Sequence, residues 1–98
     1  MSTETVAAGF DLDRPWQLHP QVSVRPERFG ALLYHFGTRR LSFLKSPALL
    51  TVVRELGDAA SAREACRRAG VTEAELPAYA AALATLAGSQ MIRVREGS

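Results

Sequence analysis

The feature that most limits the fold of this chain is a change of hydrophobic period just before its middle. In "GTRRLSFLKSPALL", residues 37–50, Leu41 and Phe43 alternate with Arg40, Ser42 and Leu44, as in a pleated strand. Ser46 and Pro47 then match a helix N-cap and a first helical position. The sequence therefore predicts strands before this junction and helices after it.

Three strands are predicted before the junction, in residues 21–25, 31–36 and 39–45. "PERFG" supplies turn residues between the first two, and a two-residue Gly37–Thr38 loop is compatible with a primed hairpin turn between the others. That loop would place Phe36 opposite Arg39, Tyr34 opposite Leu41, and Leu32 opposite Phe43.

This register divides the hairpin into two unlike faces. One face is clearly apolar, with Leu32, Tyr34, Phe36, Leu41 and Phe43. The other is mixed, with Leu33, His35, Arg40, Ser42 and Leu44. We expect a three-stranded antiparallel meander with one face on a core.

Three helices are predicted after the junction. The first ends at Gly57, the second begins with a Ser61–Glu64 capping box, and the third occupies the stretch from Thr72 to Ile92. Within the third, either a first turn breaks at Pro77 or the regular helix begins there. The fold class is α+β: a three-stranded antiparallel meander followed by three helices, in a winged helix-turn-helix arrangement.

Length and composition predict a single small domain. We expect a flexible tail at residues 1–9 and one domain over residues 10–95. The net charge is +2, and the single cysteine, Cys66, allows no intramolecular disulfide. Without a signal peptide or a membrane-length apolar segment, we expect a cytoplasmic protein with no membrane partner.

The residues argue against catalysis and against nucleic-acid binding. His19 and His35 have no metal-ligand spacing around them, and Cys66 lies on an apolar helix stripe, so we expect no enzyme activity, cofactor or metal. Residues 69–92 contain no lysine or arginine, although DNA-reading helices need such side chains. A small winged-helix DNA-binding transcriptional regulator is kept as the alternative.

The third predicted strand has an unusual outer edge. The first strand lies between Pro20 and Pro26, whereas residues 39–45 contain no proline and are rich in strand-forming residues. Proteins normally disable such an edge, so we expect a partner strand to pair with it. We expect residues 10–20 to be an irregular arm whose Phe10, Leu12, Trp16 and Leu18 pack against the body of the domain. The alternatives for the strand edge are that this arm covers it or that the other subunit of a homodimer does.

The segments "HPQVSVRPERFGALLYHF", "RRLSFLKSPALLTVV" and "LPAYAAALATLAGSQMI" resemble the PqqD-like recognition elements, and most closely the peptide-binding chaperones of mycofactocin biosynthesis. These are small winged-helix modules that bind the leaders of ribosomally made, post-translationally modified peptides. The resemblance implies that the chain binds a precursor leader as an added strand. It also implies association with a radical S-adenosylmethionine (radical SAM) maturase, which holds the iron–sulfur clusters, and no catalytic residues in the module itself.

Carried onto this chain, the resemblance implies a leader groove between the third strand and the third helix. Its strand side is Arg40, Leu41, Ser42, Phe43 and Leu44, and its helix side is Tyr79, Ala82, Leu83 and Leu86. Leaders in this pathway tend to be acidic, which Arg39, Arg40 and Lys45 would suit. Two departures from the broader family, Lys45–Ser46 in place of an asparagine and Val52–Val53 in place of an aromatic residue, bear on the shape of the groove.

Overall fold

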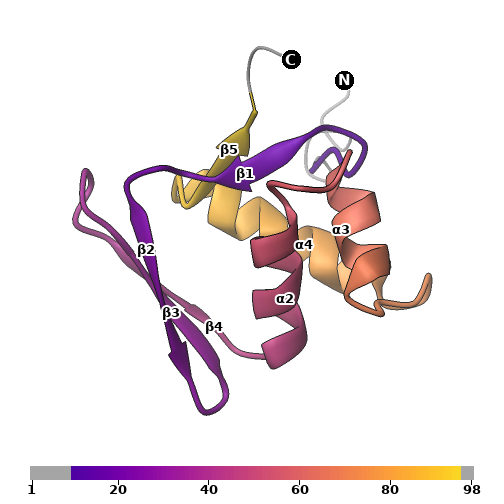
Figure 1. Cartoon of the computed structure of the whole chain (residues 1–98), viewed down its shortest axis with the longest axis horizontal. Helices are drawn as coiled ribbons and strands as arrows, with labels where there is room; N and C mark the ends of the chain where they lie inside the picture. Colours follow the sequence, from indigo (N-terminus) through magenta and orange to yellow (C-terminus); the bar gives the residue numbers. More distant parts are fainter. Residues whose placement is uncertain (1–9, 96–98) are drawn as a thin grey trace, which may run out of the picture.

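The computed structural model describes residues 10–95, so the tail predicted at residues 1–9 lies outside the described residues. Strands β2 (Val22–Glu27), β3 (Gly30–His35) and β4 (Leu41–Leu44) form an antiparallel sheet in that order. Helices α2 (Pro47–Glu55), α3 (Ala62–Arg68) and α4 (Leu76–Gly88) follow and lie on one side of the sheet (Figure 1). The predicted α+β order, a meander followed by three helices, is confirmed.

The register of the β3–β4 hairpin is the predicted one, but its turn is wider. Leu32 pairs with Phe43, and Tyr34 pairs with Leu41. The predicted two-residue loop is wrong, because the turn is closed by hydrogen bonds from His35 N–H to Arg40 O and from Arg39 N–H to His35 O. Arg39, with φ 65°, supplies the left-handed residue that allows this closure.

The sheet buries its mixed face and exposes its apolar one. Ala31, Leu33, His35 and Leu44 are buried against the helices. The opposite side, which we call the outer face, carries Leu32, Tyr34, Phe36, Leu41 and Phe43, and three of these side chains are largely exposed. The Nδ1 of buried His35 accepts the N–H groups of Gly37 and Thr38, whereas its Nε2 has no hydrogen-bond partner among the described residues.

Helices α2 and α3 begin where their capping residues predict. The Ser46 hydroxyl accepts the Leu49 N–H, and the Ser61 hydroxyl accepts the Glu64 N–H. Thr72 and Glu75 cap one another in a separate turn, and α4 then starts at Leu76 with proline in its first turn. The second of the two readings of Pro77 is therefore confirmed.

A second, two-stranded sheet joins the two ends of the described chain. Strand β1 (Trp16–Leu18) pairs antiparallel with β5 (Ile92–Val94), above the helices in Figure 1. The segment around β1 was expected to be an irregular arm, and that expectation is wrong for its central residues. Its apolar side chains pack on the core as expected: Phe10, Leu12, Trp16 and Leu18.

Candidate functional site

The outer edge of β4 offers unpaired backbone groups within the described residues. His35 N–H donates to Arg40 O over 2.9 Å, so in the antiparallel ladder Ser42 and Leu44 also turn their N–H and C=O groups toward β3. The backbone groups of Leu41 and Phe43 therefore point away from the sheet. This edge contains no proline, as the sequence predicts.

The opposite edge of the sheet is less suited to pairing. Phe36 N–H donates to Gln21 O, and the same alternation turns the backbone groups of Val22, Val24 and residue 26 outward on β2. Residue 26 is Pro26, which has no N–H to donate. The sheet thus has one blunted edge and one that is open to a further strand.

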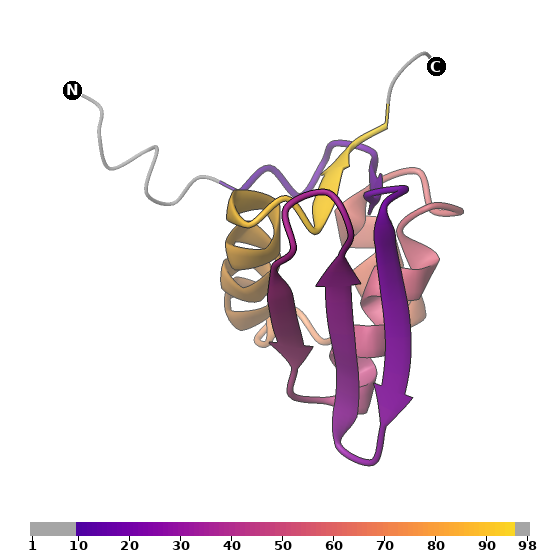
Figure 2. The same cartoon turned by 90° about the vertical axis from the view of Figure 1, so that its left-hand side faces the viewer.

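Helix α4 runs beside the open edge of β4 (Figure 2). Two hollows lie beside α4, one near each end of β4: the first is lined by the start of α2 and by α4, and the second by the hairpin turn and the end of α4. The hollow at the end of β4 holds about 250 Å³ and is mostly apolar, with Ser46, Leu49, Ala78, Tyr79 and Ala82 around it. The hollow at the start of β4 holds about 290 Å³ and is polar, with Thr38, Arg40, Gly88, Ser89 and Gln90 around it. We call them the apolar hollow and the polar hollow.

Three of the predicted site residues line these hollows: Arg40 lies at the polar hollow, and Tyr79 and Ala82 lie at the apolar hollow. Arg39, Arg40, Leu41, Phe43 and Lys45 are exposed, and Ser42, Tyr79 and Ala82 are half-buried. Leu44, Leu83 and Leu86 are buried in the core.

Sequence reasoning missed several residues around the hollows: Thr38, Ser46, Leu49, Ala78, Gly88, Ser89 and Gln90. Ala78 lies one helical turn before Ala82, and helical spacing does indicate that the two small side chains share a face of the helix, although the predicted site includes only Ala82. The residues at the end of α4 carry no such signal, because only the fold brings Gly88 to Gln90 beside the hairpin turn.

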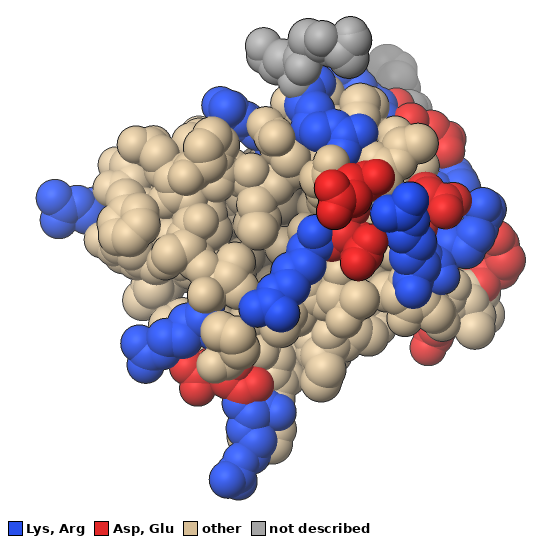
Figure 3. Space-filling model, in the orientation of Figure 1, with Lys and Arg blue, Asp and Glu red and all other residues tan. Residues whose placement is uncertain are grey.

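Positive charge is concentrated on the sheet. Residues 22–45 contain five basic residues and one acidic residue, a net charge of +4, whereas the rest of the chain has seven basic and nine acidic residues. The one acidic residue of the sheet, Glu27, is paired with Arg25 at 3.1 Å. Most of the red side chains in Figure 3 accordingly lie over the helical half. The groove and the outer face are therefore attractive to acidic partners.

Reactive side chains elsewhere in the described chain form no second site. Burial raises the pKa of the Cys66 thiol, which favours an inert thiol. No three His, Cys, Asp or Glu side chains among residues 10–95 are placed to hold a metal ion. Nor is any helix in this part of the chain long and apolar enough to cross a membrane.

Comparison with known proteins identifies the family. The model of the Peptide chaperone MftB family matches residues 15–93. A "Peptide chaperone MftB" from Mycobacterium ulcerans (strain Agy99) is 59% identical over 90 residues, covering 92% of this chain and 83% of the relative. The protein of that name from Mycobacterium tuberculosis (strain ATCC 25618 / H37Rv) is 59% identical over 87 residues, covering 89% of this chain and 80% of the relative.

A third relative of the same name, from Mycolicibacterium smegmatis (strain ATCC 700084 / mc(2)155), is 53% identical over 83 residues, covering 85% of this chain and 81% of the relative. No solved structure matches the chain. The family match spans both sheets and all three helices described above. The chain therefore belongs to the Peptide chaperone MftB family, whose members are peptide chaperones and not enzymes.

Proposed function

We propose that this chain binds the leader of the mycofactocin precursor peptide as a fourth strand on β4 and delivers it to the radical SAM maturase. The observation that carries the proposal is the open edge of β4, where Leu41 and Phe43 present unpaired backbone groups beside α4. Ladder hydrogen bonds supply affinity in such a complex, and pockets for alternate side chains supply specificity.

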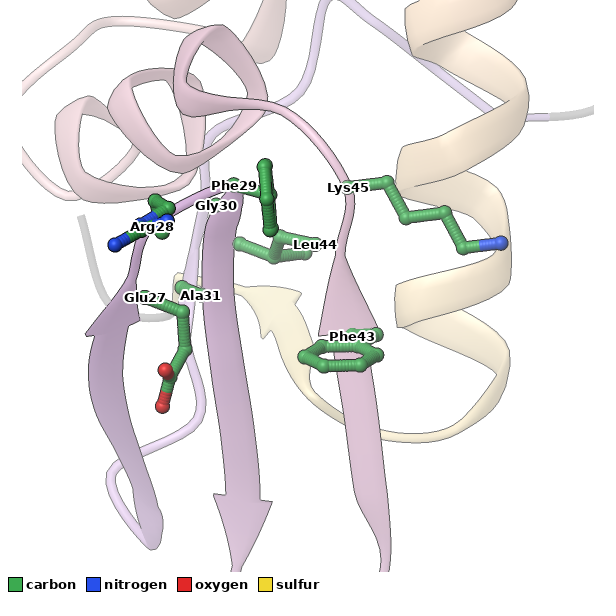
Figure 4. A pocket seen from close by; sticks show the side chains of 8 residues that line it. All are labelled: Glu27, Arg28, Phe29, Gly30, Ala31, Phe43, Leu44 and Lys45. Carbon is green, nitrogen blue, oxygen red and sulfur yellow. The ribbon is translucent and has the colours of Figure 1, made fainter.

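The two hollows suggest what the leader must contain. From Arg40 to Ser46 an extended chain covers about 20 Å, so six or seven leader residues fill the groove. The apolar hollow, beside Leu49 and Tyr79, suits an apolar anchor, and the polar hollow, beside Arg40, suits an acidic or amide side chain. Exposed Lys45 extends from the end of β4 toward α4 (Figure 4) and adds a second cation along the groove.

The chaperone contributes no chemistry in this proposal. It holds the leader so that the rest of the precursor stays at high effective concentration near the maturase. The DNA-binding alternative has little support, because α4 carries no lysine or arginine with which to contact DNA.

Two substitutions at one position test strand pairing. Phe43→Ala removes the side chain and keeps the outward N–H, whereas Phe43→Pro removes both. We expect Phe43→Pro to bind a fluorescently labelled leader peptide about tenfold more weakly than Phe43→Ala, because one ladder hydrogen bond is worth about 1 kcal/mol and the leader carbonyl loses its partner. Fluorescence anisotropy measures both affinities, and amide spectra confirm that both variants are folded.

Equal leader affinities for the two folded variants would contradict pairing through the Phe43 donor. A wild-type protein that binds no leader, even at millimolar peptide, would contradict the proposed function itself. In that case the edge of β4 would serve a different partner or self-association.

A further inference from the structure

The outer face of the sheet is an apolar surface that the leader groove does not use. Phe36, Leu41 and Phe43 are 59%, 60% and 64% exposed, and Tyr34 packs edge-on against Phe36 with ring centroids 5.0 Å apart. Phe29, in the turn before β3, is 74% exposed. Single exposed apolar residues are ordinary, but a contiguous group of aromatic and leucine side chains is characteristic of an interaction surface.

A pocket extends this face at one end of the sheet. It holds about 430 Å³ between the β2–β3 turn and the end of β4, and Phe29 and Phe43 stand at its walls (Figure 4). Gly30 shapes the pocket, since a Cβ at this position would lie 1.9 Å from the Leu44 carbonyl oxygen. The pocket is large enough for one apolar side chain of a partner.

The charges around the face select the kind of partner. Glu27 is neutralised by Arg25, and in the described chain no ion pair involves Arg28, Arg39, Arg40 or Lys45. A second copy docked face to face would bring these cations against their own equivalents, which is unfavourable. A partner surface with acidic residues around its apolar contact would instead be attracted to these cations.

We infer that the outer face is the docking site for a folded protein partner, and that this partner is the maturase. The contact surface of this partner has a projecting apolar side chain surrounded by acidic residues. The inference rests on the proposed function, which supplies the maturase as partner. A leader at the edge of β4 leaves the outer face of β2, β3 and β4 uncovered, so the same chaperone molecule holds both.

Variants that lie away from the β4 edge test this inference. We would measure the affinity of the full chain for the purified maturase by biolayer interferometry, and its affinity for the labelled leader peptide by anisotropy. The double variant Phe29→Ser/Phe36→Ser removes two exposed rings, and we expect maturase binding to fall at least tenfold while leader binding stays within twofold of wild type. When Phe36→Leu replaces Phe36→Ser in the double variant, part of the lost affinity for the maturase should be restored.

A charge pair supplies a matched control. Arg28→Glu reverses the charge of a residue that lines the pocket. Arg54→Glu makes the same change at an exposed position of α2. We expect only Arg28→Glu to slow association with the maturase, with a difference that shrinks at high salt.

The outcomes separate the two proposals. Normal maturase binding by the double variant would overturn the docking site and leave leader binding intact. A wild-type protein that dimerises in sedimentation experiments, with dimerisation abolished by the double variant, would also overturn it, because the face would then be a homodimer interface. Failure of the wild type to bind the leader at all would count against the proposed function, as stated above.

Discussion

At the scale of single residues, His19 and His35 form a pair that the sequence does not predict. They lie on different segments, and the fold brings their ring centroids to 4.4 Å. The Nδ1 of His19 accepts the Gln21 N–H at 3.0 Å, and the Nδ1 of His35 accepts two N–H groups of the hairpin turn. Protonation of the His19 Nδ1 would turn this acceptor into a donor, so the hydrogen bond from the Gln21 N–H requires a neutral His19 imidazole.

This arrangement predicts a pH-dependent stability. Partial burial, followed by the nearby charges of His35 and Arg93, lowers the pKa of His19 below its ordinary 6.5. The unfolded chain therefore takes up the proton at a higher pH than the folded chain does. We expect the contribution of His19 to the free energy of unfolding to be complete above pH 6.5 and to be lost as the pH falls through the lowered pKa.

His19→Asn tests this expectation, because an Asn oxygen can still accept the Gln21 N–H but does not titrate. Urea unfolding over a pH series should show a smaller loss of stability on acidification in this variant than in the wild type. Identical pH profiles would show that another group causes the loss.

At the scale of elements, the sequence predicts which residues share a face but not which face is covered. The period of two and the hairpin register assign Leu32, Tyr34, Leu41 and Phe43 to one side correctly. Hydrophobicity alone would bury that side, yet the helices cover the side with Leu33 and His35. The reason is tertiary: the His35 Nδ1 accepts two N–H groups of its own turn, and the sequence does not show that Arg39 adopts the left-handed conformation that closes this turn.

The contact between β3 and β4 depends on Gly30. Its φ is 156°, and a Cβ would lie 1.9 Å from the Leu44 carbonyl oxygen, which is backbone and cannot move aside. We expect Gly30→Ala to lower the free energy of unfolding by more than about 2 kcal/mol, because the end of the hairpin must separate. Gly88→Ala is the control, since a Cβ there meets no atom within 4 Å. A similarly small effect of both substitutions in chemical denaturation would contradict this account.

At the scale of the whole molecule, the β1–β5 sheet joins distant parts of the chain. The alternation in "MIRVRE" predicts a short extended segment at β5, but the pairing was not predicted, because each strand has three residues and the partners lie near opposite ends of the described chain. Next to β5, the Arg95 guanidinium donates to the carbonyls of Leu56, Gly57 and Ala59 at 2.7–2.8 Å. These bonds satisfy the carbonyl groups where α2 ends.

Loss of these bonds should therefore destabilise the whole domain. We expect Arg95→Ala to lower the free energy of unfolding by about 1–3 kcal/mol, since charge-assisted hydrogen bonds to partly buried carbonyls disappear. Arg93→Ala, at the exposed position of β5, should have a much smaller effect. Thermal unfolding compares the two, and equal melting temperatures would show that the Arg95 contacts do not stabilise the fold.

The outer face ends at the same strand edge where the proposed leader binds, and this has a thermodynamic consequence. A leader paired with β4 would add every second side chain to that face, so a maturase docked there would contact two chains as one continuous surface. Coupling of this kind is reciprocal: the factor by which the leader raises affinity for the maturase is the factor by which the maturase raises affinity for the leader. A chaperone without its peptide would then bind the maturase more weakly than a peptide-loaded one. Empty chaperones would therefore not keep loaded chaperones from the enzyme.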